Sequence, residues 1–389
     1  MAQTPSTPTT LITDSPALAT LCATLSTHPF IAVDTEFLRD KYYYPKLCLV
    51  QIGDANGQYL IDPLAPDIDL APLWALFTNT AVLKIFHSAK QDIETIFHIT
   101  GQMITPLYDT QVAAMAIGYF SHTSYAALVS DFLKVSLDKS SQFSQWDTRP
   151  LSAKQLTYAA DDVRYLYQLY PLLHQKITQQ DREHWLEDDM LLLTDPKTYA
   201  IDPDTAWQRL SLRDRSPVFL GVVRALASWR ELEARRHNRP RTHILKDAAL
   251  TDIASRRPGN ADQLARIRGI HHMTTTQNTA LLTAISEGIK NPVHTPPETL
   301  HMNGATPEEK YLCDLLKIAL YATAKKHHIA ERLIASSQDI TDLVLRPSAP
   351  SPVMSGWRYD MFGKQIEAIL AGELSLRVHQ GKIDLLPCV

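Results

Sequence analysis

Three separated blocks of the sequence carry carboxylates and one phenol at spacings that would let them meet at one point. The blocks hold Asp34 with Glu36, then Asp92, and finally Tyr158 with Asp162. Hard carboxylate oxygens suit Mg²⁺ or Mn²⁺. Two such ions about 4 Å apart can activate a water on one side of a phosphorus and stabilise the leaving oxygen on the other. The residue set therefore predicts a two-metal site for phosphodiester hydrolysis.

The first block lies in an apolar, β-branched run, residues 30–37, which is typical of a buried strand. Asp34 and Glu36 stand at positions i and i+2, so they leave the same face roughly 6.6 Å apart. Crowded, poorly hydrated anions need a cation or hydrogen-bond donors nearby. The alternative is an edge strand with its polar face in water, but the four apolar residues before Asp34 favour a buried strand.

The third block is predicted to lie on a helix that begins with a capping box, Ser152 and Gln155. Tyr158 and Asp162 then share one helical face, one turn apart. Such a pair alone is common surface chemistry, and only the other blocks favour a site. Asp161 is rotated by about 100° from Asp162 and is predicted to point away from the metals.

The middle block is a strand, residues 82–86, that runs into a helix carrying Asp92 and Glu94. Both acids fall in the first turns, where the helix dipole also favours a simple capping role. Asp92 lies beside the apolar stripe of Ile93 and Ile96, whereas Glu94 is turned away from it. The pattern therefore favours Asp92 as the ligand.

These blocks, in this order, resemble the DEDD exonucleases of the subgroup with a catalytic tyrosine, and within it the bacterial ribonuclease D family. The resemblance implies that Asp34 bridges two Mg²⁺ or Mn²⁺ ions and that Glu36 and Asp162 hold the ion carrying the attacking water. It implies that Asp92 supports the second ion and that Tyr158 orients the water. Supporting stretches are Tyr43-Tyr44-Pro45-Lys46-Leu47, Gln51-Ile52, His87-Ser88-Ala89-Lys90-Gln91, Tyr108-Asp109-Thr110-Gln111, Leu137-Asp138-Lys139-Ser140 and Trp146.

The resemblance implies the fold class α/β, with a ribonuclease H-like mixed sheet flanked by helices. Stretches such as Leu226–Arg230 and Leu264–Ile270 resemble an HRDC domain, and two all-helical domains of this type are expected to follow the sheet. Patterning agrees with the first part. Asp109 precedes a helix and is predicted to be its N-cap. Strands are predicted near 30–37, 46–53, 57–62 and 81–86, and helices near 15–26, 90–99, 110–117, 125–133 and 152–175.

The predicted domains are an exonuclease domain (1–200), an HRDC domain (205–290) and a degenerate HRDC-like domain (306–389), with a Pro-rich linker over 291–306. Residues 205–290 hold 15 Lys or Arg against 7 Asp or Glu, while the whole chain has a net charge of −4. A basic module beside an acidic site suits a polyanionic substrate, although such a cluster can be merely a solvated face. The predicted nucleic-acid-binding residues are Arg230, Arg235, Arg236, Arg239, Arg241, Arg266 and Arg268.

The HRDC resemblance is carried by Leu226–Arg230, Pro240, Leu250–Ala254, Pro258 and Leu264–Ile270. Residues 306–389 hold 10 basic and 10 acidic side chains. Their net charge gives no particular reason to expect RNA binding, so a scaffold role is an equal alternative.

Composition fits a cytoplasmic enzyme with no membrane or protein partner indicated. No apolar run is long enough to cross a bilayer, and the four cysteines have no zinc-site spacing. The expected activity is 3′→5′ exoribonuclease cleavage that releases nucleoside 5′-monophosphates and, by resemblance, trims structured RNA such as tRNA precursors. Two alternatives stay open: a DNA exonuclease of the same superfamily and a non-catalytic RNA-binding protein.

Overall fold

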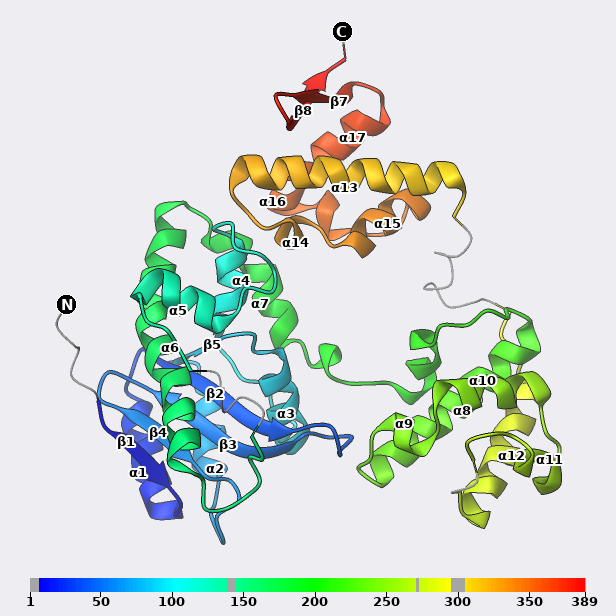
Figure 1. The fold of residues 1–389 in the computed structure, drawn as a ribbon, viewed down its shortest axis with the longest axis horizontal. Coiled ribbons are helices and arrows are strands. Elements are labelled where there is room, and N and C mark those ends of the chain that lie inside the picture. The colour runs from blue at the N-terminus through cyan, green and yellow to red at the C-terminus, as the bar shows by residue number, and fades with distance from the viewer. Residues whose placement is uncertain (1–6, 139–143, 271–272, 295–304, 389) are drawn as a thin grey trace. The chain divides into compact units, whose positions relative to one another are not determined.

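The computed structural model describes residues 7–138, 144–270, 273–294 and 305–388, which form two compact units (Figure 1). One unit contains residues up to 37, residues 47–198 and residues from 306 onward. The other contains residues 38–46 and 199–305. Most of the expected linker, and Lys139 and Ser140 of the resemblance, lie outside the described residues. Within the described residues no helix is long and apolar enough to span a membrane.

A six-stranded mixed sheet forms the centre of the first unit, in the order β1-β4-β3-β2-β5-β6. β2 pairs in parallel with β5, β5 with β6 and β1 with β4, whereas β3 and β4 are antiparallel. β2 is therefore an interior strand, which excludes the edge-strand alternative. The strands are β1 Thr9–Ile12, β2 Phe30–Leu38, β3 Lys46–Gly53, β4 Gln58–Ile61, β5 Leu83–Phe86 and β6 Leu107–Asp109.

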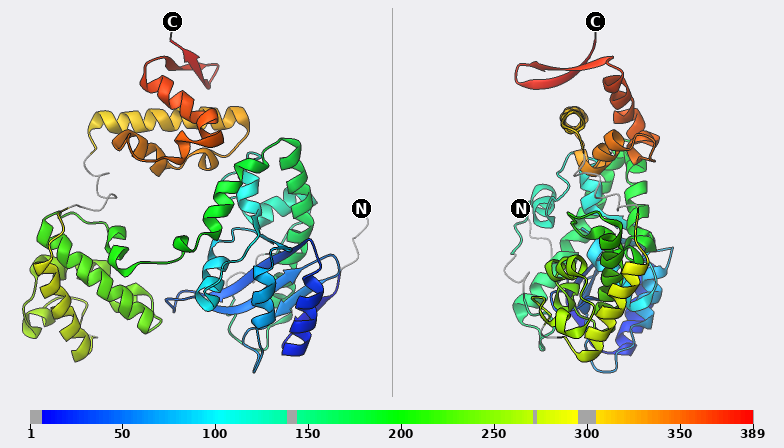
Figure 2. Two further views of the ribbon diagram at one scale, coloured as in Figure 1. Left: turned by 180° about the vertical axis from the view of Figure 1, so that it is seen from behind. Right: turned by 90° about the vertical axis from the view of Figure 1, so that its right-hand side faces the viewer.

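Helices cover both faces of this sheet. The long helix α6 crosses the face turned to the viewer in Figure 1, and α1, α2 and α3 lie on the opposite face, seen from behind in Figure 2. The predicted capping box of Ser152 and Gln155 begins α6. The helices of this domain are α1 Ser15–Leu25, α2 Ala71–Thr78, α3 Lys90–Thr100, α4 Thr110–Met115, α5 Tyr125–Leu133, α6 Ala153–Gln179 and α7 Glu187–Thr194.

The C-terminal segment packs onto the exonuclease domain and shares a hydrophobic core with it, which includes Met115, Leu186, Leu316 and Phe362. It also ends in a hairpin of β7 and β8, so the expectation of an all-helical domain here is wrong in this part. Its elements are α13 Pro307–His327, α14 Glu331–Ile334, α15 Ser337–Leu345, α16 Gly356–Arg358, α17 Lys364–Leu370, β7 Leu374–His379 and β8 Lys382–Pro387.

The second unit is helical around its own apolar core. Its central helix α8 spans Pro217–Arg236 and packs closely against α12. A Cβ at Gly288 would lie 2.4 Å from the Cα of Val222, so the approach of these two helices requires glycine there. The remaining helices are α9 Arg241–Ile244, α10 Asp247–Arg256, α11 Ala261–Ala265 and α12 Thr275–Lys290.

Candidate active site

The first two carboxylates project from the middle strand of the sheet. Ile31, Ala32 and Val33 of β2 are fully buried, so the strand is anchored in the core just before Asp34 and Glu36. The i, i+2 spacing places both acids on one face of β2. A rigid interior strand therefore fixes the separation of these two side chains.

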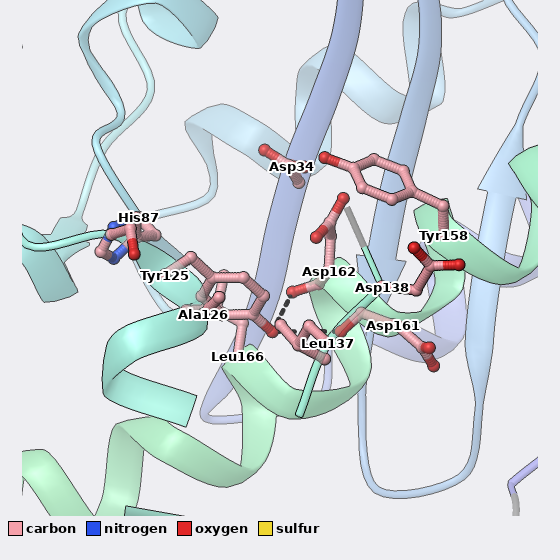
Figure 3. Close-up of a pocket in the computed structure, with 11 residues that line it drawn as sticks. Asp34, His87, Tyr125, Ala126, Leu137, Asp138, Tyr158, Asp161, Asp162 and Leu166 are labelled. Carbon is pink, nitrogen blue, oxygen red and sulfur yellow. Dashed lines mark hydrogen bonds between the residues drawn. The ribbon is translucent and has the colours of Figure 1, made fainter. Parts of the chain in front are cut away.

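A third carboxylate comes to this pair from α6. One oxygen each of Asp34, Glu36 and Asp162 lie within 4.8 Å of one another. The Tyr125 hydroxyl donates hydrogen bonds to the backbone oxygens of Asp162 (2.7 Å) and Asp161 (3.1 Å) and so ties this turn of α6 to α5. Figure 3 shows Asp162 and Tyr158 turned toward Asp34, with Asp161 directed elsewhere.

The crowded acids resist ionisation when no cation is present. Burial, followed by the charges of Asp34, Asp162 and Asp92, raises the pKa of Glu36 to about 10. Burial and the neighbouring Asp161 raise the pKa of Asp162 to about 8. The pKa of Asp34 is also well above its ordinary value, through burial and then the charge of Asp162. Each carboxylate therefore needs a proton or a metal ion to offset its burial.

The three-carboxylate group fits a divalent cation. Its donors are carboxylate oxygens, which Mg²⁺ and Mn²⁺ prefer. The buried Oδ2 of Asp162 has no hydrogen-bond partner among the described residues. A buried acceptor that is aimed into a group of acids and left unpaired is unfavourable unless a cation binds it.

Asp92, the fourth predicted ligand, is held beside this group by a residue of β2. The Thr35 hydroxyl donates a hydrogen bond of 2.5 Å to Asp92 Oδ1, and both side chains are buried. Asp92 lies near enough to raise the pKa of Glu36, but it is not one of the three mutually close carboxylates. Glu94 instead lies 4.0 Å from His98, one turn further along α3.

Asp109 organises the backbone around Asp92. It is the N-cap of α4, as predicted, and accepts a hydrogen bond from the Gln111 N–H. Its carboxylate also accepts from the N–H groups of Ser88 (3.0 Å) and Ala89 (2.8 Å). Ala89 is the N-cap of α3, so one buried carboxylate fixes the starts of two helices and with them the position of Asp92.

Tyr158 lies one turn before Asp162 and hydrogen-bonds to its carboxylate. Burial, then the charges of Asp162 and Glu36, raises the pKa of the Tyr158 phenol, so the hydroxyl stays protonated and acts as a donor. Asp161 forms an ion pair with Arg164 at 2.7 Å, outside the three-carboxylate group, which agrees with its predicted orientation.

These residues open into a cavity of about 280 Å³ (Figure 3). The residues that line it are Asp34, His87, Ser124, Tyr125, Ala126, Leu137, Asp138, Tyr158, Asp161, Asp162 and Leu166. His87, Leu137 and Asp138 belong to stretches that support the family resemblance. Ser124, Tyr125 and Ala126, at the start of α5, were not predicted, because they are distant in sequence from the three blocks of acids.

Comparison with known proteins decides the family. Curated ribonucleases D from Zymomonas mobilis and Granulibacter bethesdensis are each 40% identical to this chain, and the aligned regions cover 96–97% of both partners. This chain belongs to the ribonuclease D family. Residues 9–178 match the 3′-5′ exonuclease family, and residues 219–285 match the HRDC domain.

A solved structure supports the same assignment for the fold. The crystal structure of Escherichia coli RNase D, described as an exoribonuclease involved in structured RNA processing, superposes with a TM-score of 0.81 at 28% identity. The superposition covers 93% of this chain and 98% of that one. This superposition confirms the fold class that was inferred from the sequence, a ribonuclease H-like sheet followed by helical C-terminal parts.

The structure separates the seven predicted arginines of the HRDC unit into groups. Arg230 is only 5% exposed, and its guanidinium donates to Leu245 O and to Asp247, so it is a structural residue and the prediction that it contacts nucleic acid is corrected. Arg235 and Arg241 lie 3.6 and 3.5 Å from the same buried residue, Glu231, whose single charge offsets part of theirs. Four arginines are exposed at the surface, namely Arg236, Arg239, Arg266 and Arg268.

Thr35→Val is expected to lower kcat by about tenfold, because the isosteric side chain keeps the packing but cannot hold Asp92. Loss of residues that orient a metal ligand typically costs about 10–100-fold in affinity or activity. Thr35→Ser supplies the matched control, since it retains the hydroxyl and should recover most of the rate. Equal rates for the Val and Ser variants would show that the hydrogen bond does not position Asp92 for the reaction.

Proposed function

We propose that this protein is a metal-dependent 3′→5′ exoribonuclease that releases nucleoside 5′-monophosphates and trims structured RNAs such as tRNA precursors. The observation that carries the proposal is the group of Asp34, Glu36 and Asp162 with the Tyr158 hydroxyl beside it. Membership in the ribonuclease D family supports the direction of cleavage and RNA as the substrate class.

In this proposal Asp34, Glu36, Asp92 and Asp162 hold two Mg²⁺ or Mn²⁺ ions. Such ions supply an activated water and stabilise the leaving oxygen of an in-line displacement. The chain's own residues do the positioning. β2 and α6 bring the ligands together. The protonated Tyr158 hydroxyl, which hydrogen-bonds to the Asp162 carboxylate, positions the attacking water beside it. The cavity of about 280 Å³ gives room for a terminal nucleotide at this position.

The acidic residues act on a phosphodiester and do not themselves read a 2′-hydroxyl, which is what distinguishes RNA from DNA. The direct test is digestion of matched RNA and DNA strands with 3′ overhangs in Mg²⁺, in Mn²⁺ and in EDTA. We expect nucleoside 5′-monophosphates from RNA, a much slower reaction on DNA and none in EDTA. Preferential digestion of DNA would support the DNA exonuclease alternative, and RNA binding without digestion in either metal would support the non-catalytic one.

The exposed arginines of the HRDC unit are proposed to attract structured RNA. Arg239→Ala, Arg266→Ala and Arg268→Ala combined should raise KM on a tRNA precursor, because each arginine that neutralises a phosphate contributes to affinity. The slope of log affinity against log salt should flatten by roughly 0.7–0.9 for each arginine–phosphate pair that the substitutions remove. Kinetics measured over roughly 50 to 200 mM salt, the range in which this dependence is steep, would show both effects.

The matched control for this variant is Lys290→Ala, an exposed cation at the end of α12 that pairs with Glu287. It should leave KM and the salt slope as in the wild type. If the triple arginine variant also behaves as wild type, these arginines form only a solvated face of the HRDC unit.

A further inference from the structure

A second cavity, of about 330 Å³, lies where the exonuclease domain meets the C-terminal segment. One wall is the connection between α4 and α5, residues 117–121, and the other is the end of α13 with the start of α14. Tyr119, Phe120 and Tyr321 line it. Phe120 is 82% exposed and Tyr321 is 50% exposed, so this cavity, here called the seam groove, presents aromatic rings to solvent.

The seam groove also carries positive charge. Lys325 lies 5.9 Å from the centroid of the Tyr321 ring, and Arg332 lines the same cavity. Both cations are exposed, as is the adjacent Lys326, and Glu331 is the one carboxylate among the lining residues that the structure describes. The equal counts of basic and acidic residues over 306–389 conceal this local excess of cations.

The walls of the groove are fixed to each other. The Arg182 guanidinium donates hydrogen bonds to Ala116 O (2.7 Å), His327 O (2.8 Å) and His328 O (3.1 Å), so it caps the ends of α4 and α13 together. The Ala330 N–H donates to Met115 O at 2.8 Å. A Cβ at Gly118, which has φ +92°, would lie 3.1 Å from His328 O. The groove is therefore preformed and needs no domain movement to assemble.

The groove and the active site share one stretch of chain. Residues 117–121 line the groove, and only three residues further on Ser124, Tyr125 and Ala126 begin to line the active-site cavity. The Tyr125 hydroxyl is bonded to the backbone of Asp162. A strand with its 3′ end among the carboxylates can thus continue along this connection toward Phe120.

We infer that the seam groove binds a single-stranded segment of the RNA substrate upstream of its 3′ end. Bases stack on Phe120 and Tyr321, and phosphates pair with Lys325 and Arg332. Aromatic platforms combined with cations are the usual means of binding single strands without reading their sequence. An apolar protein partner would leave both cations unpaired in the interface, so the mixed chemistry favours RNA. This inference rests on the proposed function.

The test measures how two double variants hydrolyse two unstructured RNAs, one of about 4 and one of about 20 nucleotides. These lengths lie at the lower end of and above the usual site size for a single strand. The double variants are Phe120→Ala with Tyr321→Ala, and Lys325→Ala with Arg332→Ala. Each should lower kcat/KM on the long RNA relative to the short one by about tenfold, since stacking of one base contributes about 1–3 kcal/mol. Tyr311→Ala and Lys317→Ala, on α13 but outside the groove, are the matched controls and should keep the wild-type ratio. A melting curve is recorded for each variant to check that it folds.

Direct binding is measured by ultraviolet crosslinking of thiouridine-labelled RNA to full-length protein in EDTA, followed by peptide mapping. Crosslinks to the 117–121 peptide or to the end of α13 are expected. A wild-type ratio for both double variants, with no crosslink at the groove, would overturn the inference and indicate a protein-binding surface or a scaffold. Hydrolysis of the short RNA reports separately on the proposed function, since that result does not depend on the groove.

Discussion

Asp162→Asn is expected to abolish hydrolysis while making the metal-free protein more stable above pH 7. Asp162 supplies one of the three mutually close carboxylates, and its Oδ2 has no other partner among the described residues. Loss of residues that merely orient a metal ligand costs about 10–100-fold. We therefore expect loss of a ligand to reduce kcat by about 10³-fold or more, with a much smaller effect on RNA affinity.

The stability effect follows from the raised pKa of Asp162, about 8. Between the ordinary carboxyl pKa and this value, the folded state binds a proton that the unfolded state has released. Stability of the wild type in EDTA therefore falls as pH rises from about 4 to 8. Asn carries no titrating carboxyl and avoids this loss, so the variant should melt higher in EDTA at pH 8, by roughly 2–4 °C for each kcal/mol.

Thermal melting with and without Mg²⁺ completes the experiment. The metal binds only the folded site, so it should raise the melting temperature of the wild type and have little effect on Asp162→Asn. Glu94→Gln, a change of an acid that faces His98 on α3, is the control and should keep both activity and the metal response. Turnover close to that of the wild type for Asp162→Asn would exclude Asp162 as a metal ligand.

The parts of the site that local patterns encode could be predicted from the sequence. A run of β-branched residues placed Asp34 on a buried strand, and the structure has β2 there. The capping box at Ser152 predicted where α6 starts, and therefore that Tyr158 and Asp162 lie on the same face of this helix. Burial periodicity and caps act over a few residues, so their consequences are readable without knowing the tertiary fold.

Interactions between distant segments could not be predicted in the same way. The hydrogen bond from Thr35 to Asp92 joins residues 57 positions apart, and the Asp109 hydrogen bonds to the start of α3 span about 20. Arg230 was misassigned because its burial depends on how α8 packs against the helices that follow. A count of charged residues depends on composition alone, whereas the burial of a side chain depends on tertiary packing, so the count could not separate Arg230 from the exposed arginines.

Short elements were missed for different reasons. β1 and β6 have only four and three residues, too few for a reliable period, and depend on the strands beside them. The β7–β8 hairpin did have a local signal in the alternation of Leu374, Leu376 and Val378. Gln380 and Gly381 both have positive φ, as a two-residue hairpin turn requires. The predominantly helical pattern of the preceding residues obscured this hairpin.

Tyr158→Phe is expected to reduce kcat by about 10²-fold or more, within the range for positioned acid–base groups. The variant keeps the ring, whose centroid lies 6.0 Å from that of Trp146, and removes only the hydroxyl. All four carboxylates are retained, so the rise in melting temperature on adding Mg²⁺ should match that of the wild type. Single-turnover rates on a short RNA would measure the chemical step directly.

The pH profile distinguishes the two roles that a phenol can have here. Burial and nearby carboxylates raise the pKa of Tyr158, so the hydroxyl stays protonated through neutral pH and positions the water by a hydrogen bond. The Phe variant should then show a profile of the same shape at a lower rate, and Tyr165→Phe, on the same helix, should match the wild type. If only the wild type gains rate as pH rises, bound metals depress this pKa and Tyr158 acts as the base. Full activity of Tyr158→Phe would mean that another residue orients the nucleophile.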